Sequence, residues 1–457
     1  MKKLNVNLAI FIGILVLYVA GQALIGTYHP DNKQFRFDAP SDVDFLYYGA
    51  IINTVLDSMP PENPAFGGVK LTQPFIQYYP AAMLAGVFNP YNSIRILNII
   101  YLILFWLLLK NLFPDKYGLP LVILFASSTF GAEINSLGVD LIARGFTHAP
   151  FFILLAAAIF CRKLSIRLAA VFAAALINGY LMLIAMIYFG VMLIMKRSRV
   201  NVCLIASSLV GLVIASIIVY SQATHELFYT PFVRAFAFNP IEIIKHAAPF
   251  IILLLFYRHT GMTVLLVISI IFGSLIHYNP FFPVFMVYLS GSMLMAAGER
   301  RRPQSGLVGL AVTVLLCAGF IVSAYGKYNP HNRNYYPRYD SRLDRSINWV
   351  LDNTDDDDVF LALLLDNTDL ALIMQHRPVY LGYIGHVAHL RLNWQDRYNQ
   401  FVKMFATGQA PKEVGYIYFG PVENKYFPEA HLSYPIVYQD EQGKIYKTKR
   451  DRLRFDL

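Results

Sequence analysis

The chain has 457 residues, of which 56% are hydrophobic and only 15% are charged, and its formal net charge is +9. Soluble proteins carry roughly 45–50% apolar and about 25% charged residues, so this composition excludes a water-soluble enzyme and a disordered chain. A secreted disulfide scaffold is excluded as well, because there are only three cysteines and each lies inside an apolar run. The mean hydropathy of +0.47 indicates a protein that crosses a membrane several times.

Apolar runs of membrane-spanning length, which is about 17–25 residues, recur as far as residue 325. The long runs are 8–26, 94–112, 200–221, 241–257, 261–278, 281–298 and 305–325. Shorter runs occupy 118–131 and 149–161, and the run 166–195 divides into two short helices near Asn178-Gly179. The sequence therefore predicts a polytopic α-helical membrane protein with about 11 transmembrane helices.

Lys and Arg residues are concentrated in alternate loops, and such a bias orients a helical bundle with the basic loops in the cytoplasm. The loops predicted to be cytoplasmic contain Lys2, Lys3, Lys110, Lys116, Arg162, Lys163, Arg167, Lys196, Arg197, Arg199, Arg258, Arg300, Arg301 and Arg302. We expect an integral plasma (inner) membrane protein with a cytoplasmic N-terminus and a retained first span, because no small-residue cleavage site follows that span. The positive charge is then an orientation signal and requires no nucleic-acid partner.

The tail after residue 325 lacks long apolar runs and, after an odd number of spans, lies outside the cytoplasm. Helical periodicity alternates there with short apolar strands, which predicts a small α/β domain with a largely parallel sheet. The expected helices are 342–351, 370–375 and 390–406, and the expected strands are 359–365, 378–383, 414–420, 435–438 and 444–448. We therefore expect a transmembrane domain over 1–325, with a long outer loop at 27–93, and a soluble extracytoplasmic domain over 326–457.

Two carboxylates, Asp42 and Asp44, stand one residue apart among aromatic residues in the first outer loop. A carboxylate at this position can deprotonate an acceptor hydroxyl, and the pair can hold a divalent cation such as Mg²⁺ or Mn²⁺ against a phosphate. A structural alternative is that Asp42 caps a helix over 45–57. We expect Asp42 to serve partly as this cap and Asp44 to face a cavity.

The second outer loop, 132–148, contains Asp140 and Arg144 four residues apart and ends at His148. The planar guanidinium of an arginine can bind a phosphate through two parallel hydrogen bonds. A single arginine at the membrane boundary indicates a functional role, because a charge is costly there. The structural alternative is an Asp140–Arg144 ion pair with a snorkelling arginine. The third loop, 222–240, contributes Arg234 among many aromatic residues, which are equally typical of an interfacial aromatic belt.

Other patterns narrow the class of function. The chain lacks the P-loop, GxGxxG, HExxH, GxSxG and CxxC motifs. Few charged residues lie within the apolar runs and the two halves show no obvious inverted repeat, which disfavours pumps and secondary transporters. A run of four aspartates at 355–358 could bind a divalent ion, but it is more typical of a solvated turn.

The order of these features resembles the GT-C class of integral-membrane glycosyltransferases, in particular uncharacterised bacterial members with a Pro-Pro-Glu-Asn-Pro first loop. The segments that carry the resemblance cover about a third of the chain, and they are Asp44–Tyr48, Pro60–Pro64, Ala143–Phe146, Ile347–Leu351, Arg377–Tyr383, Arg397 and Val414–Pro421. The oligosaccharyltransferase signature Trp-Trp-Asp-Tyr-Gly is missing from the tail, which argues against transfer to protein asparagine. Tyr48 stands where related sequences often have histidine.

The resemblance implies inverting transfer of a sugar from a polyprenyl-phosphate donor, with Asp44 as the general base and Asp42 assisting or binding a metal. It further implies that Glu62 assists or binds the metal and that Arg144 binds substrate. From the residues of the outer loops themselves, the further candidates for substrate binding are Tyr48, Tyr78, Tyr79, Asp140, His148 and Arg234. Arg144 would hold the lipid phosphate, and an aromatic groove including Tyr47 and Phe75 would open to the membrane lipid.

We therefore expect a glycosyltransferase that moves a sugar from a polyprenyl-phosphate donor to a cell-envelope glycan or lipid acceptor on the outer face of the membrane. One alternative is a ligase or polymerase of lipid-linked glycan, which the few basic residues in the outer loops disfavour. The other is a non-enzymatic transporter or assembly scaffold for envelope glycan.

Overall fold

The computed structural model describes residues 6–24, 28–29, 34–35, 43–71, 75–114, 116–125, 137–220, 240–275, 281–300, 303–328, 343–362, 377–382, 394–428, 432–441 and 443–448. The chain divides into two compact units. The helical unit comprises Met1–Ile25 and Ile94–Asn332, and the mixed unit comprises Gly26–Ser93 and Arg333–Leu457. The first long loop thus groups with the C-terminal tail, whereas the sequence placed it with the helices that flank it.

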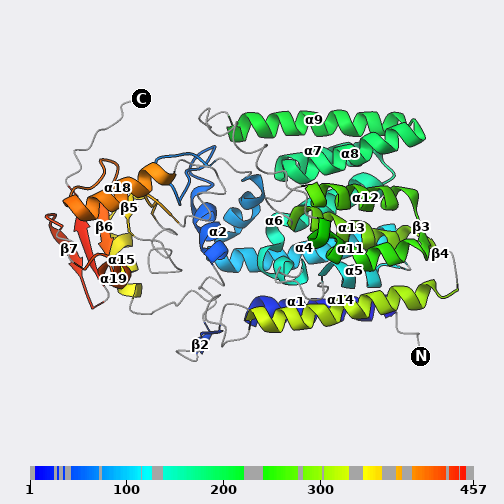
Figure 1. The fold of residues 1–457 in the computed structure, drawn as a ribbon, viewed down its shortest axis with the longest axis horizontal. Coiled ribbons are helices and arrows are strands. Elements are labelled where there is room, and N and C mark those ends of the chain that lie inside the picture. The colour runs from blue at the N-terminus through cyan, green and yellow to red at the C-terminus, as the bar shows by residue number, and fades with distance from the viewer. Residues whose placement is uncertain are drawn as a thin grey trace. The chain divides into compact units, whose positions relative to one another are not determined.

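The apolar runs predicted from the sequence form the helices of the helical unit (Figure 1). These are α1 (Val6–Leu24), α4 (Pro90–Leu112), α5 (Gly118–Phe125), α6 (Leu137–Phe160), α7 (Leu164–Ile177), α8 (Gly179–Lys196), α9 (Arg199–Tyr220), α11 (Pro240–Leu254), α12 (Thr260–Leu275), α13 (Phe281–Ala297) and α14 (Ser305–Tyr328). Two described helical stretches, Pro90–Leu112 and Arg199–Ile218, are long and apolar enough by themselves to cross a membrane.

The predicted break in the run 166–195 is confirmed. Asn178 leaves the helical conformation, with φ −149° and ψ 93°, and its side-chain oxygen accepts a hydrogen bond from the Leu181 amide at 3.0 Å. Asparagine is a favoured N-cap because its side chain satisfies an amide that has no partner within the helix. One apolar run therefore becomes two antiparallel helices, α7 and α8.

Most of the loop predicted over 132–148 is helical, because α6 begins at Leu137 and continues through the predicted span to Phe160. This agrees with the helical spacing of Asp140 and Arg144. The segment contains several good helix formers, and its charged residues are spaced i and i+4, which is compatible with a helix. Pro150 lies inside this helix. Such prolines are tolerated where neighbouring helices satisfy the freed backbone groups.

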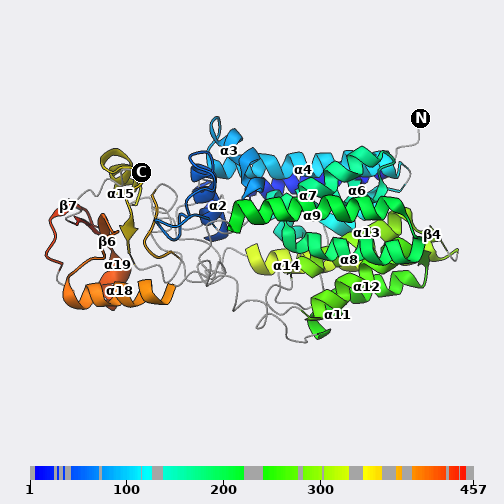
Figure 2. The same cartoon turned by 90° about the horizontal axis from the view of Figure 1, so that it is seen from above.

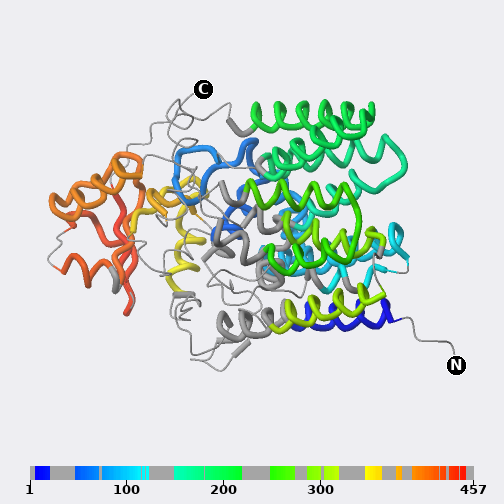
Figure 3. Tube along the Cα trace, turned by 45° about the vertical axis from the view of Figure 1, so that its right-hand side comes forward, coloured from blue at the N-terminus to red at the C-terminus, as the bar shows by residue number. Residues whose placement is uncertain are grey.

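Small residues allow the helices to approach closely, as is common in membrane proteins. A Cβ at Gly211 in α9 would lie 2.8 Å from the Ala175 side chain in α7, and the two helices run side by side (Figures 1 and 3). A Cβ at Gly291 in α13 would lie 2.1 Å from the Phe250 ring in α11. At both positions the space that a larger side chain would need is already occupied.

The mixed unit contains a four-stranded sheet with the order β5 (Phe360–Leu361), β6 (Tyr416–Phe419), β8 (Lys444–Lys447) and β7 (Ile436–Gln439). Only the β5–β6 pair is parallel, so the expectation of a largely parallel sheet is wrong for the strands that are described. The turn between β7 and β8 is short and is closed by a hydrogen bond from the Gly443 amide to the Asp440 carboxylate at 3.0 Å. Strands joined by so short a turn pair antiparallel.

Helices α15 (Leu343–Asn353) and α18 (Trp394–Thr407) cover opposite faces of this sheet (Figures 1 and 2). Trp349 of α15 contacts Tyr416, with ring centroids 6.4 Å apart, and Phe405 of α18 contacts Phe419 at 5.9 Å. Tyr416 and Phe419 are three positions apart on one strand, so they point to opposite faces. The expected helices 342–351 and 390–406 are confirmed where the structure describes them, and 370–375 lies outside the described residues.

The first loop adds α2 (Val43–Thr54), a 3₁₀ turn at Ile76–Tyr78 and α3 (Tyr79–Ala85) to the mixed unit. Gly49 in α2 lies against the Tyr91 ring, where an added Cβ would come within 2.9 Å of a ring carbon. The described elements also include α19 (Pro421–Tyr426) and two short two-stranded pairs, which are β1 (Tyr28–His29) with β2 (Gln34–Phe35) and β3 (Tyr257–Arg258) with β4 (Glu299–Arg300).

Candidate active site

The acidic pair of the first loop lies at the start of α2. Because α2 begins at Val43, Asp44 is its second residue, and Asp42, which immediately precedes the helix, lies outside the described residues. The backbone of Asp44 is described and its side chain is not. A carboxylate in the first turn of a helix interacts favourably with the positive end of the helix dipole.

The aromatic residues expected to line a groove are brought close to α2. The Tyr48 ring lies 5.8 Å from that of Tyr78 and 6.4 Å from that of Tyr47. Tyr47, Tyr78 and Phe75 are buried, and Tyr48 and Tyr79 are partly exposed. Burial raises the pKa of the Tyr47 phenol well above its usual value, and the neighbouring Tyr48 adds to the rise, so this phenol stays protonated.

Glu62 lies in a compact turn formed by residues 58–71. Its backbone forms an antiparallel bridge with Lys70, and the Asn63 side chain accepts a hydrogen bond from the Ala65 amide at 3.0 Å. Gly68 adopts a positive φ of 78°, which favours glycine. The Pro-Pro-Glu-Asn-Pro motif therefore has a structural role as the first side of a tight turn.

This turn pairs with the C-terminal tail through backbone hydrogen bonds. The Gly67 amide donates to the Val379 carbonyl at 2.8 Å, the Val379 amide to the Pro64 carbonyl at 2.9 Å and the Gly382 amide to the Ala65 carbonyl at 2.7 Å. Val379 in turn forms a parallel bridge with Phe360 of β5. The first loop thus extends the sheet of the tail, which explains why the two form one unit.

Arg397 of α18 holds the two parts of the mixed unit together. Its guanidinium lies 3.6 Å from the centroid of the Phe66 ring and donates to the carbonyls of Gly67 at 3.0 Å and Tyr380 at 2.5 Å. Partial burial lowers the pKa of Arg397 below its usual value, an effect that the nearby Tyr380 and Glu413 oppose. The resemblance included Arg397 as a matching residue, but nothing in its sequence context indicated these partners.

The candidate residues of the second loop share one helix. Asp140, Arg144 and His148 follow one another at intervals of four residues in α6, so their positions form a stripe along one side of this helix. Their side chains lie outside what the structure describes. Arg234 lies outside the described residues altogether.

The structure defines no metal centre in its described part, where His, Cys, Asp and Glu nowhere gather in groups of three or more. The four-Asp run forms a turn in which the Asp355 amide donates to the Asp358 carboxylate at 2.9 Å. Asp356 pairs with the buried Arg377 at 2.7 Å, and Arg377 also donates to the Thr354 carbonyl next to the end of α15. Its contacts therefore give this run a structural role.

Asp57 provides a test of the electrostatics around this turn. Partial burial and, secondarily, the Asp356 carboxylate raise the pKa of Asp57 above its usual value. The fold therefore favours protonated Asp57, and this stabilisation is lost as the pH rises through the raised pKa. We expect Asp57→Asn to stabilise the protein at about pH 7, by at most about 0.5 kcal/mol because solvent screens an exposed carboxylate.

Thermal unfolding of the full chain at two pH values measures this effect. The stabilisation of Asp57→Asn relative to the unchanged protein should be present at about pH 7. It should shrink below about pH 3.5, where Asp57 is protonated in both folded and unfolded states. Glu441→Gln, which removes an exposed carboxylate from the β7–β8 turn, is the control and should show no such difference. A stabilisation that is independent of pH would contradict the assignment to Asp57 charge.

The fold is GT-C-like, as the resemblance in the sequence implies. The chain is similar to ArnT from Cupriavidus metallidurans bound to undecaprenyl phosphate, with a TM-score of 0.60, 13% identity, and coverage of 96% of this chain and 97% of that one. The apo form of the same protein gives a TM-score of 0.56 at 11% identity, with the same coverage. No protein-family model matches the chain, and no curated protein does. At these identities the similarity establishes the fold alone.

Proposed function

We propose that this protein is a glycosyltransferase that moves a sugar from a polyprenyl-phosphate donor to a cell-envelope glycan or lipid on the outer face of the plasma membrane. The observation that supports it most is a fold shared over 96% of the chain with ArnT, whose structure was determined with undecaprenyl phosphate bound. A polyprenyl-phosphate donor places the chemistry at a membrane surface, which suits a chain with a mean hydropathy of +0.47.

In this reaction an acceptor hydroxyl attacks the anomeric carbon of the donor sugar from the face opposite the phosphate. The new bond joins the acceptor oxygen to that carbon, the bond from the carbon to the phosphate oxygen breaks, and the polyprenyl phosphate leaves. Asp44, in the first turn of α2, takes the proton of the hydroxyl. Inversion of the anomeric configuration follows from attack on the opposite face.

The remaining candidate residues bind the substrates. Arg144 would hold the donor phosphate in a fork of hydrogen bonds, with Asp140 and His148 on the same stripe of α6 and Arg234 assisting. Glu62 and the tyrosines near α2, Tyr48, Tyr78 and Tyr79, would contact the sugar or the prenyl chain. In the alternative role, Asp42 and Asp44 would hold a divalent cation, because carboxylate oxygens are the ligands that Mg²⁺ and Mn²⁺ prefer, and the ion would supply positive charge for the phosphate.

The decisive experiment reconstitutes the full chain in liposomes with a labelled polyprenyl-phosphate sugar and envelope glycolipid. The proposal predicts release of free polyprenyl phosphate and label in the acceptor. A transporter would move the intact labelled donor across the bilayer and leave its sugar–phosphate bond uncleaved. Loss of activity on chelation, with recovery on adding Mg²⁺ or Mn²⁺, would support the metal.

Replacement of Arg144 with Ala is expected to raise the apparent KM for the lipid donor roughly tenfold to a hundredfold, with a smaller change in kcat. The reason is that a charge-assisted hydrogen bond to phosphate contributes about 1.5–3 kcal/mol to binding. Steady-state kinetics with varied donor measure the effect. Arg162→Ala, just beyond the end of α6, is the matched control. An unchanged KM in the Arg144 variant would show that Arg144 has a structural role and does not bind the donor.

A further inference from the structure

A cavity of about 270 Å³ lies within the helical unit, among the ends of α6, α7, α8, α9 and α12. The start of α1, the turn between α8 and α9, and the β3–β4 pair lie at this same end of the unit (Figures 1 and 2). These are the segments whose Lys and Arg residues predict the cytoplasmic side. None of the residues that line the cavity belongs to the first loop, whose residues are assigned to sugar transfer.

The polar lining of the cavity is cationic. It consists of Arg167, Tyr188, Lys196, Ser198, Asn201 and His259, and no carboxylate accompanies them among the described lining residues. The Arg167 Nε donates to the Ala158 carbonyl at 2.5 Å, which positions the guanidinium, while its two terminal nitrogens make no hydrogen bond to the described part of the chain. Lys196 adds a second full positive charge at the end of α8.

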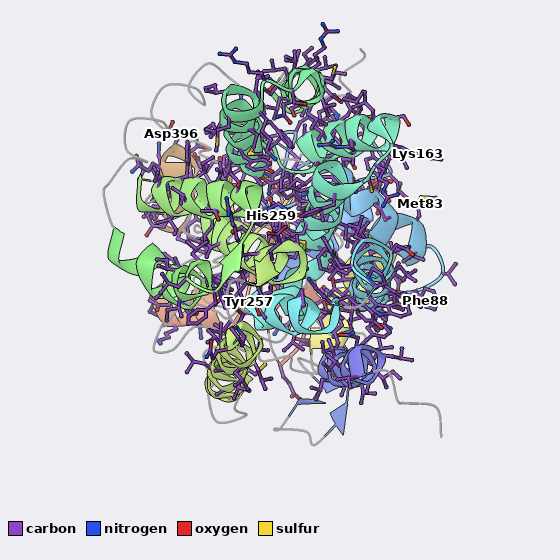
Figure 4. All side chains as sticks on the ribbon, turned by 90° about the vertical axis from the view of Figure 1, so that its right-hand side faces the viewer. Met83, Phe88, Lys163, Tyr257, His259 and Asp396 are labelled. Atoms are coloured by element: carbon purple, nitrogen blue, oxygen red, sulfur yellow. The ribbon has the colours of Figure 1, made fainter. Side chains whose placement is uncertain are left out.

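His259 contributes a hydrogen-bond donor. Its Nδ1 accepts a hydrogen bond from the Met262 amide at 3.2 Å, so in the neutral ring the proton resides on Nε2, which can donate. Figure 4 views the molecule from the end at which β3 and β4 lie and shows His259 among the helix ends, with Lys163 well apart from it. Gly261 preserves space beside the ring, because a Cβ there would lie 3.1 Å from the Tyr188 hydroxyl.

Asn201 is the observation that points to a ligand. It is only 8% exposed and lines the cavity, and its backbone amide donates to the Ser198 carbonyl. Its side-chain amide has no hydrogen-bond partner among the described residues. The amide opens onto the cavity, where a bound polar group can accept from its nitrogen or donate to its oxygen.

We propose that this cavity binds a phosphate group, carried either by an anionic lipid headgroup or by free phosphate. Two cations and several neutral donors, without a carboxylate among the lining residues that the structure describes, match the charge and the acceptor oxygens of a phosphate. Basic pockets between transmembrane helices on the cytoplasmic side are known to bind lipid headgroups. Neither the site nor its test depends on the sugar-transfer activity.

Native mass spectrometry of the full chain, released from detergent, tests this proposal by counting bound ligands during titration. The probes are short-chain phosphatidylglycerol, short-chain phosphatidylcholine and inorganic phosphate. We expect one phosphatidylglycerol to bind saturably and phosphatidylcholine to bind at least about tenfold more weakly. Displacement by inorganic phosphate at similar concentration would identify free phosphate as the ligand, and retention of the lipid would identify the headgroup.

Two independent variants and one control locate the site. Lys196→Met removes a charge, whereas Asn201→Leu removes only the buried amide, and each should weaken binding at least about tenfold. Lys163→Met removes a charge from the same end of the unit without touching the cavity and should change the affinity less than about twofold. Circular dichroism confirms that the variants are folded. Absence of saturable binding, or equal loss in Lys163→Met and Lys196→Met, would overturn the proposal.

Discussion

Replacement of Asp44 with Asn is expected to abolish sugar transfer while the protein remains folded and inserted in the membrane. The amide is nearly isosteric with the carboxylate but cannot accept the proton of the acceptor hydroxyl. A positioned general base contributes about 10²–10⁴-fold to a rate, so transfer should fall by at least about a hundredfold. The measurement is transfer of label from a polyprenyl-phosphate sugar in proteoliposomes that contain equal amounts of each protein.

Asp57→Asn is the matched control, because it makes the same substitution in the same loop just after the end of α2. It should leave transfer unchanged. Asp42→Asn separates the remaining roles: a role as helix cap predicts lower stability with substantial activity, and a role as metal ligand predicts a higher Mg²⁺ requirement. Full activity of the Asp44 variant would overturn the assignment of this residue as the base.

Replacement of Arg397 with Met is expected to separate the turn at residues 58–71 from the tail. The change removes hydrogen bonds to two carbonyls, which contribute about 1.5–3 kcal/mol each, and a cation–π contact of about 0.5–2 kcal/mol. A net loss of about 3 kcal/mol would accelerate amide exchange roughly a hundredfold. Hydrogen exchange at Gly67, Val379 and Gly382 reports this directly, because these amides form the junction.

Lys403→Met serves as the control for this experiment, since Lys403 is an exposed cation on the same helix. It should leave the three amides as protected as in the unchanged protein. Arg397→Lys should give an intermediate result, because lysine retains the charge but lacks the planar fork that stacks on Phe66. Unchanged exchange in Arg397→Met would show that the backbone pairing is sufficient by itself.

The elements that the sequence predicted well depend on local patterns. The apolar runs became helices, the break at Asn178 was marked by a cap residue, and β7 and β8 lie at the expected strands 435–438 and 444–448. In the second loop, the spacing of Asp140 and Arg144 predicted one helical face, and both residues lie within α6. The start of this helix at Leu137, ahead of the apolar run 149–161, was not predicted.

Among the candidate site residues, local patterns placed Asp44 near the start of a helix and Arg144 four residues after Asp140 on one face. They could not identify the partners of Arg397 or the cavity near His259, because each joins segments that are remote in the chain. Arg397, for example, donates to the carbonyl of Gly67, 330 positions earlier. Contacts between segments so far apart in the sequence depend on how the folded segments fit together and on backbone groups that every residue shares.

By itself, the sequence determined the apolar helical runs and the acidic and aromatic residues of the first loop, because composition and periodicity follow from the identity of each residue and its neighbours. Only the tertiary structure decided that the first loop forms one unit with the tail. The physical reason is that backbone hydrogen bonds such as Gly67 to Val379 are indifferent to side-chain identity. The tight packing of Gly67, where an added Cβ would lie 3.1 Å from the Val359 side chain, is recognised only once that neighbour is in place.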